Sequence, residues 1–237
     1  MYITNIIRDD GFGAQYQTIM FTILYAELYN LEFVYRPFST MAHNYDNDES
    51  FLQKKEKFIN IINNYKNINE VDPKKILTIP LQQIYKEVEQ RLDLLVTTNS
   101  FRKIQDLFYE NKNKTHDNVL TVHIRRPNKF DIGSYGYEQD DYYLKSIELV
   151  LNRNKDIEKI KIFSQGDISD FKNFDHNFTE FHLNEPIEET FSNMVFSDHF
   201  IMSKGSFSYT AALLNLNSIY YLPFWHPPLS KWIKLTT

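Results

Sequence analysis

Cysteine, an excess of positive charge and long hydrophobic runs are all missing from this chain of 237 residues. The absence of cysteine excludes a disulfide framework and cysteine-based zinc sites, and it suits a reducing compartment. Acidic residues outnumber lysine and arginine by 31 to 26, which gives a net charge of -5 with histidine neutral. Proteins that hold long nucleic acids usually present a basic face, so we expect no nucleic-acid partner.

No apolar stretch near the N-terminus is long enough for a signal peptide before charged residues return. The apolar segment at 19–29 is also much shorter than the ~20 residues that a membrane-spanning helix needs. We therefore expect a soluble, cytoplasmic protein without a transmembrane segment. Hydrophobic residues make up 42% of the chain and charged residues 24%, proportions that are typical of a packed globular core.

The first half of the chain predicts short strands between helices, because apolar residues recur at alternating or helical spacing. The expected strands cover 2–8, 31–38 and 76–80, and the expected helices cover 14–29, 51–66, 81–95 and 99–111. A polar stretch at 110–118 lacks apolar periodicity and is the best candidate for a linker. It divides the chain into halves at 1–115 and 116–237.

Strands and helices alternate more regularly in the second half. The expected strands cover 120–126, 159–166, 179–184, 199–204 and 218–223. The expected helices cover 139–153, 168–174, 187–197, 206–214 and, at the end of the chain, 227–235. Strand–helix alternation with short connections predicts an α/β fold with a parallel, doubly wound sheet in this half.

The first motif with chemical meaning is LTVHIRRPNK at 120–129, an apolar strand that ends in two arginines. Alternation divides its side chains between two faces, with Leu120, Val122 and Ile124 on one and Thr121, His123 and Arg125 on the other. Two guanidinium groups at a strand end can fork onto phosphate oxygens, and Lys129 adds a third cation. The alternative is a pair of exposed arginines that form salt bridges with Asp140 or Asp141.

The second motif, SKGSFSYTAALLN at 203–215, predicts a strand end, a tight turn and the start of a helix. Backbone N–H groups without helical partners and the positive end of the dipole favour a phosphate at Ser206, Phe207 and Ser208. An ordinary serine N-cap without a ligand is the alternative. A third motif, GFGAQYQ at 11–17, allows close backbone approach after the first strand, but it lacks the third glycine of a dinucleotide loop.

Together the three motifs resemble a family of sugar-transferring enzymes. HIRRPNK at 123–129 is similar to the HxRRxD/N signature of α-1,2- and α-1,6-fucosyltransferases and of related protein O-fucosyltransferases. GFGAQ at 11–15 is similar to their GxGNQ or GFGCQ loop, and the segment at 203–215 resembles their SNSSFSWWAALL segment. The three motifs occur in the same order as in the family, whereas residues 40–115 match no motif of this family.

This resemblance implies a GT-B-like fold, in which two Rossmann-type halves face each other across a donor cleft. It implies transfer of fucose from GDP-fucose to a glycan hydroxyl with inversion, without a metal or another cofactor. The acceptor side would be formed by 1–115 and the donor side by 116–237. The implied donor contacts are Gly13, Gln15, His123, Arg125, Arg126, Glu189, Ser206, Phe207 and Ser208.

Fixed cations and N–H dipoles would stabilise the charge that develops on the departing diphosphate, and Arg126 is the expected catalytic cation. A general base can come from four carboxylates after the arginine pair, of which we favour Asp131 over Glu138, Asp140 and Asp141. Departures from the family include Asn128 in place of the commoner aspartate and Tyr209–Thr210 in place of paired tryptophans.

A rival signal is the Asp46-Asn47-Asp48 triplet, because a DxD pair can hold Mn²⁺ or Mg²⁺ on a sugar nucleotide. Its context is a polar segment before a charged helix rather than a strand end, which favours an exposed acidic loop or a helix start. Two further functions stay open: transfer from another nucleotide sugar, and a carbohydrate-binding descendant without catalysis.

Overall fold

The structure, a computed structural model, describes residues 1–110, 112, 118–126, 137–174 and 178–236. The chain divides into two compact units, Met1–Asn113 and Lys114–Thr237, which are described in turn. Within the described ranges, no helix is both long and apolar enough to cross a bilayer. The mixed α/β class and the parallel sheet of the second half are confirmed. That the two halves face each other stays a prediction.

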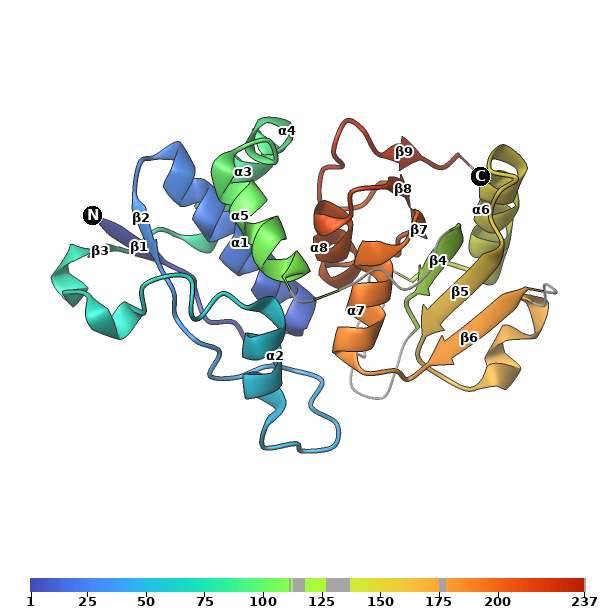
Figure 1. Cartoon of the computed structure of the whole chain (residues 1–237), viewed down its shortest axis with the longest axis horizontal. Helices are drawn as coiled ribbons and strands as arrows, with labels where there is room; N and C mark the ends of the chain where they lie inside the picture. The colour runs from blue at the N-terminus through green and yellow to red at the C-terminus, as the bar shows by residue number, and fades with distance from the viewer. Residues whose placement is uncertain (111, 113–117, 127–136, 175–177, 237) are drawn as a thin grey trace. The chain divides into compact units, whose positions relative to one another are not determined.

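The N-terminal unit is a small parallel sheet with helices packed around its first helix (Figure 1). Its strands are β1 (Tyr2–Thr4), β2 (Glu32–Val34) and β3 (Ile76–Leu77), in the order β2-β1-β3. Its helices are α1 (Phe12–Leu28), α2 (Phe51–Ile59), α3 (Leu81–Glu89), α4 (Leu92–Leu95) and α5 (Asn99–Tyr109), with 3-10 turns η1 (Ile68–Glu70) and η2 (Pro73–Lys75). α1 is buried along nearly its whole length because α3 and α5 both pack on it.

Helix α2 is shorter than the expected span of 51–66. Asn60, directly after Ile59, has a left-handed backbone with φ 54°, and its N–H donates to the carbonyl of Glu56. Asparagine adopts this conformation more readily than most residues and ends helices there. Ile61 is then buried off the helix, so the apolar residues after Asn60 serve the core without extending α2.

The C-terminal unit contains a parallel sheet of six strands in the order β6-β5-β4-β7-β8-β9. The strands are β4 (Val119–Ile124), β5 (Lys159–Ser164), β6 (Thr179–Leu183), β7 (His199–Ile201), β8 (Ser218–Tyr221) and β9 (Ile233–Lys234). The chain therefore starts in the middle, adds strands outward to β6, and returns to add β7, β8 and β9 on the other side. Adjacent β4 and β7 form the topological switch point, where open α/β sheets bind ligands at the carboxyl ends of strands.

Helices cover both faces of this sheet (Figure 1). α6 (Asp140–Arg153) and the 3-10 turn η3 (Ile168–Phe174) cover one face, and α7 (Ile187–Phe196) and α8 (Ser206–Leu214) cover the other. The alternation expected for β4 is confirmed, since its apolar residues share a core with Tyr143 and Ile147 of α6. On the opposite face the Thr121 hydroxyl donates to the Asn193 carbonyl of α7 over 3.4 Å.

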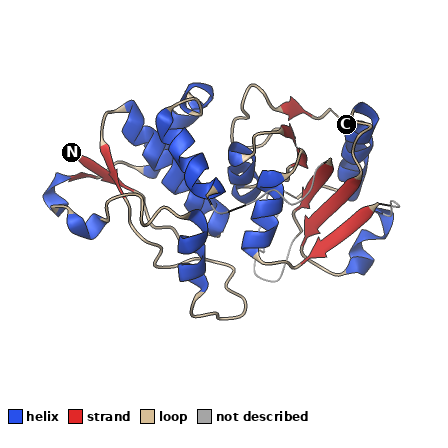
Figure 2. Cartoon of the chain, viewed as in Figure 1, coloured by secondary structure: helices blue, strands red, loops and turns tan. Residues whose placement is uncertain are grey.

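The helix expected at 227–235 is wrong, because this segment turns and adds the edge strand β9 (Figure 2). The Trp232 N–H donates to the Leu229 carbonyl in a turn, and Leu235 N–H donates to Tyr221 of β8. Leu229, Trp232 and Leu235 are all buried, so their spacing of three, which resembles a helical period, reflects burial of a turn and an edge strand.

Candidate anion site at the switch point

The two adjacent arginines after β4 diverge to opposite faces of the sheet. Arg125 continues the His123 face and reaches the turn before α8, where a β-carbon built on Gly205 would lie 3.1 Å from its Nη1 atom. Arg126 continues the other face, and its guanidinium carbon lies 5.0 Å from the ring centre of Phe171 in η3. This differs from the expected fork of two guanidinium groups on one ligand, and it follows from the alternation of side chains along a strand.

Arg125 is held between two turns. The Tyr137 ring, just before α6, lies 5.4 Å from the guanidinium carbon, and Gly205 is in contact on the other side. Gly205 is the N-cap residue of α8, and among the described residues no side chain caps this helix start. A guanidinium beside the positive end of a helix is unfavourable alone, but both attract the same anion. The arrangement is therefore suited to a phosphate or diphosphate.

Of the three residues expected at this helix start, Ser206 and Phe207 are partly exposed and Ser208 is fully buried. The Ser206 hydroxyl lies 3.5 Å from Nε2 of His226, and the Phe207 ring meets the edge of His123 with centroids 5.5 Å apart. Ser208 Oγ lies 2.5 Å from Nδ1 of His123. Ser206 and Phe207 are thus accessible to a ligand, whereas Ser208 is packed beneath the turn; contact of all three with a donor stays a prediction.

His123 joins the two turns of the switch point as a neutral side chain. Its Nδ1 atom also lies 2.9 Å from the hydroxyl of Ser203, two residues after β7. Burial, with a smaller contribution from the nearby Arg125, lowers the pKa of His123 to about 3. The imidazole is therefore uncharged at neutral pH and supports the Arg125 turn through hydrogen bonds.

The lowered pKa of His123 makes the protein sensitive to acid. Between about pH 6.5 and the folded pKa of about 3, the unfolded chain binds a proton that the folded chain does not, so stability falls as pH falls. The variant His123→Asn keeps a polar atom near the Nδ1 position but does not titrate in this range. When the pH falls from 6.5 to 4.5, we expect the free energy of unfolding to drop in both proteins, and to drop by about 2 kcal/mol less in the variant. Urea unfolding at both pH values measures this difference. Equal losses in the two proteins would contradict a neutral His123.

Arg126 has an acidic partner. Its Nη2 atom lies 2.6 Å from Asp140 of α6, and both side chains are mostly buried. Its Nε atom is buried and makes no hydrogen bond to the residues that the structure describes. The salt bridge with Asp140 is the alternative that the sequence left open for this pair, so direct binding of a diphosphate by Arg126 stays a prediction.

The four candidate bases have different surroundings. Asp131 lies outside the described residues, Asp140 pairs with Arg126, and Asp141 is exposed on the first turn of α6. Glu138 forms an ion pair with Lys204, which directly precedes Gly205. This pair links the turn before α6 to the turn before α8, on either side of Arg125. Glu138 is therefore the described carboxylate that lies beside the Arg125 turn.

Glu189 is exposed on the first turn of α7, and its backbone carbonyl accepts a hydrogen bond from the Asn193 side chain at 3.0 Å. This helix follows β6, which is two strands away from β4 in the sheet. Its link to the Arg125 turn runs through Phe191, whose ring lies 5.5 Å from that of Phe207. The resemblance places an acidic residue near the guanine of the donor, and this role for Glu189 stays a prediction.

The expected donor residues Gly13 and Gln15 lie on α1 of the N-terminal unit, and both are buried. The Gln15 amide donates to the carbonyls of Asp10 and Thr40, at 3.1 and 2.7 Å, so it fixes the loops around the start of α1. Gly11 faces His43, since an added β-carbon would lie 2.7 Å from the imidazole Cδ2. Packing within this unit therefore explains Gly11 and Gln15, and donor contact stays a prediction.

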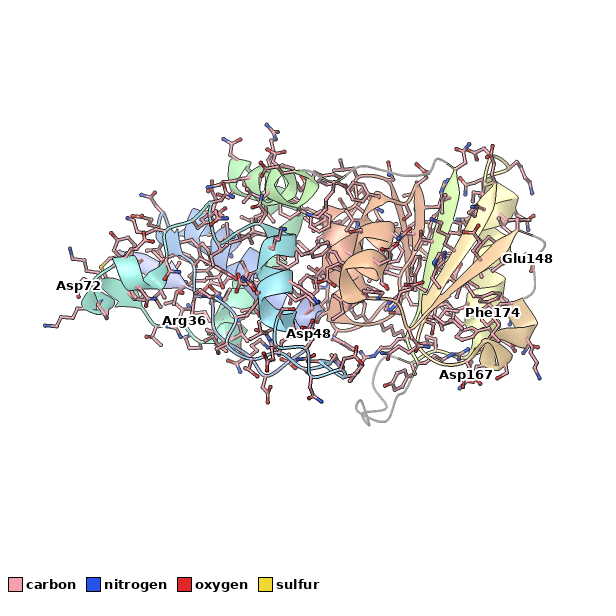
Figure 3. The ribbon with its side chains drawn as sticks, turned by 60° about the horizontal axis from the view of Figure 1, so that its bottom comes forward. Arg36, Asp48, Asp72, Glu148, Asp167 and Phe174 are labelled. Atoms are coloured by element: carbon pink, nitrogen blue, oxygen red, sulfur yellow. The ribbon has the colours of Figure 1, made fainter. Side chains whose placement is uncertain are left out.

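Asp48 of the DxD triplet is bound within its own segment, next to the start of α2 (Figure 3). Its carboxylate lies 2.6 Å from Lys54 Nζ and accepts hydrogen bonds from Ser50, and these contacts hold the pKa of Asp48 well below its usual range. Among the described residues, no three histidine or acidic side chains gather in a group that could hold a metal ion.

Three residues of the site were not singled out by the sequence. Gly205 stands between an expected strand and an expected helix start, so the sequence could have indicated a turn at SKGS that approaches other groups closely. Tyr137 and Lys204 carried none, because an isolated tyrosine or lysine has many roles and only the fold brings them to Arg125 and Glu138.

No protein-family model and no curated protein sequence matches the chain. Solved structures similar to it include the fucosyltransferase NodZ from Bradyrhizobium, with 12% identity, a TM-score of 0.44, and coverage of 90% of this chain and 93% of that one. POFUT1 in complex with GDP is 11% identical, with a TM-score of 0.47 and coverage of 93% and 97%. The E. coli heptosyltransferase WaaC with ADP-2-deoxy-2-fluoro heptose is 12% identical, with a TM-score of 0.46 and coverage of 99% and 93%.

Proposed function

We propose that the chain is a glycosyltransferase that takes a sugar from a nucleoside diphosphate. The observation that carries this proposal is the position of Arg125, whose guanidinium contacts Gly205 at the start of α8, a helix start that no described side chain caps. Both groups lie at the carboxyl ends of β4 and β7, the switch point of the sheet. A diphosphate there would receive a planar cation and backbone N–H groups together.

The same groups suit the chemical step. As the bond between the sugar and the diphosphate breaks, negative charge grows on the leaving group. A fixed guanidinium and helix N–H groups stabilise that charge more in the transition state than in the ground state. The acceptor hydroxyl needs a base, for which Asp131 and Glu138 are the candidates. In this mechanism Arg125 and the start of α8 would stabilise the leaving group without a metal.

For the donor we propose GDP-fucose, and for the acceptor a glycan hydroxyl, with inversion at the transferred carbon. The support for fucose is the ordered set of sequence motifs around His123–Arg126, Ser206–Ser208 and Gly11–Gln15. A guanidinium and a helix start recognise the diphosphate alone, so a transferase for another nucleotide sugar is the alternative.

A panel of nucleotides tests this proposal by thermal unfolding in the presence of EDTA. GDP and GDP-fucose are expected to raise the melting temperature more than UDP, ADP and their sugars at the same concentration. A ligand that binds more tightly stabilises the protein more, and one present at 100 times its Kd adds about 2.7 kcal/mol of stability. Release of GDP from GDP-fucose under the same conditions then measures turnover. A larger shift with UDP- or ADP-sugars would favour the alternative donor, and no shift with any nucleotide would exclude both transferases.

A further inference from the structure

An exposed tryptophan in the loop that packs against α8 has no role in the function proposed so far. Trp225 lies in the connection from β8 to β9 and is 53% exposed. Other large apolar side chains of this connection are much less exposed, including Trp232 at 6% and Leu229 at 2%. Single exposed apolar side chains are common, but this indole follows the carboxyl end of β8, on the side of the sheet where open α/β sheets bind ligands.

The loop that carries Trp225 is firmly fixed to α8. The Tyr209 hydroxyl of α8 donates to the Pro227 carbonyl at 2.8 Å. The Tyr209 ring stacks on His226 with centroids 4.7 Å apart and an interplanar angle of 25°, and it meets Phe224 edge-on at 5.7 Å. Pro223, Pro227 and Pro228 further limit the backbone. The exposed ring is therefore presented by a rigid support, which lowers the entropy cost of binding.

The same loop is continuous with the anion site. His226, directly after Trp225, has its Nε2 atom 3.5 Å from the hydroxyl of Ser206, the first residue of α8. Ser206 follows Gly205, which contacts Arg125. Trp225 is thus directly followed in the chain by a residue that reaches the first residue of α8, on the β8 side of the switch point.

We propose that Trp225 stacks on the sugar ring of the nucleotide sugar, an inference that rests on the proposed function. From a diphosphate at the switch point, the nucleoside and the sugar extend in different directions. The β6 side presents hydrogen-bonding groups at the start of α7, such as Glu188 and Glu189, which suit the polar edge of a base. The β8 side presents an indole face, which suits the apolar face of a pyranose and keeps water from the bond that breaks.

The test compares GDP with GDP-fucose on the whole protein and on Trp225→Ala by calorimetry. We expect the variant to bind GDP as the parent does and to bind GDP-fucose about tenfold more weakly, the equivalent of about 1.4 kcal/mol. Leu216→Ala is the matched control. Leu216 is 61% exposed, and it lies in the connection from α8 to β8, at the amino end of β8 and not at its carboxyl end. It should change neither affinity.

Fluorescence supplies a second measurement on the unmodified protein. The chain has two tryptophans and Trp232 is buried, so acrylamide quenching reports mainly on Trp225. GDP-fucose should protect the fluorescence more than GDP does. If Trp225→Ala weakened the binding of GDP and GDP-fucose equally, the indole would stack on the guanine base and not on the sugar. If the variant bound both ligands as the parent does, and both ligands protected the parent's fluorescence equally, the inference would be overturned. If the unmodified protein binds neither ligand, the proposed function fails as well.

Discussion

Replacing Arg125 by alanine is expected to weaken GDP binding by at least a hundredfold while leaving the fold intact. A guanidinium forms two charge-assisted hydrogen bonds with a phosphate, and each contributes about 1.5–3 kcal/mol. The contacts of Arg125 with Tyr137 and Gly205 lie at the partly exposed end of β4, outside the apolar core. Calorimetry with GDP and thermal unfolding of the free protein measure the two effects.

Arg126→Ala and Arg153→Ala are the controls for this experiment. Arg126 is paired with Asp140, so its removal should leave a buried carboxylate without its partner and lower stability more than it lowers GDP affinity. Arg153 is exposed at the end of α6 and should affect neither. If Arg126→Ala abolished binding and Arg125→Ala did not, the assignment of the anchor to Arg125 would be reversed.

A single added methyl group at Gly205 is expected to reduce GDP affinity by about tenfold to a hundredfold, which corresponds to one charge-assisted hydrogen bond. In Gly205→Ala the new β-carbon would lie 3.1 Å from Nη1 of Arg125, closer than an ordinary contact. The end of a long side chain can move aside cheaply, so the loss should appear in binding, as a displaced guanidinium, with a smaller effect on stability.

The double variant separates this mechanism from a general disturbance of α8. If Gly205→Ala acts by displacing Arg125, it should have little further effect on GDP affinity in an Arg125→Ala background, because the two changes remove the same contact. Additive losses in the double variant would show that Gly205 acts through the helix start itself. Thermal unfolding of all three variants serves as the control for folding.

The order of the elements from β4 to β8 followed from the sequence, because strands and helices alternate regularly over that part of the chain. Alternation predicted which side chains of β4 share a face. The same rule, extended past the strand, places Arg125 and Arg126 on opposite faces. A cation pair was nevertheless expected to act together, since the sequence does not show that Phe171 and Asp140 lie on the second face.

Other features depended on contacts between distant segments. The end of the chain has apolar residues spaced by three, and burial against Tyr209 and pairing with β8 made it a turn and an edge strand. Similarly, nothing local to Gln15 shows that its amide is engaged by Thr40, 25 residues away. The sequence indicated the type of chemistry at the switch point, whereas the partners of each side chain were decided by tertiary packing.

The ion pair between Glu138 and Lys204 has a mechanical consequence. It spans the seam between β4 and β7, where the β4-β5-β6 half of the sheet joins the β7-β8-β9 half. Both side chains are about a quarter exposed, at 23% and 26%, so dissolved ions can screen their attraction. Rising ionic strength should therefore act on this protein in two ways. It should weaken the attraction of Arg125 for an incoming anion, and it should weaken the Glu138–Lys204 ion pair that joins the two halves of the sheet.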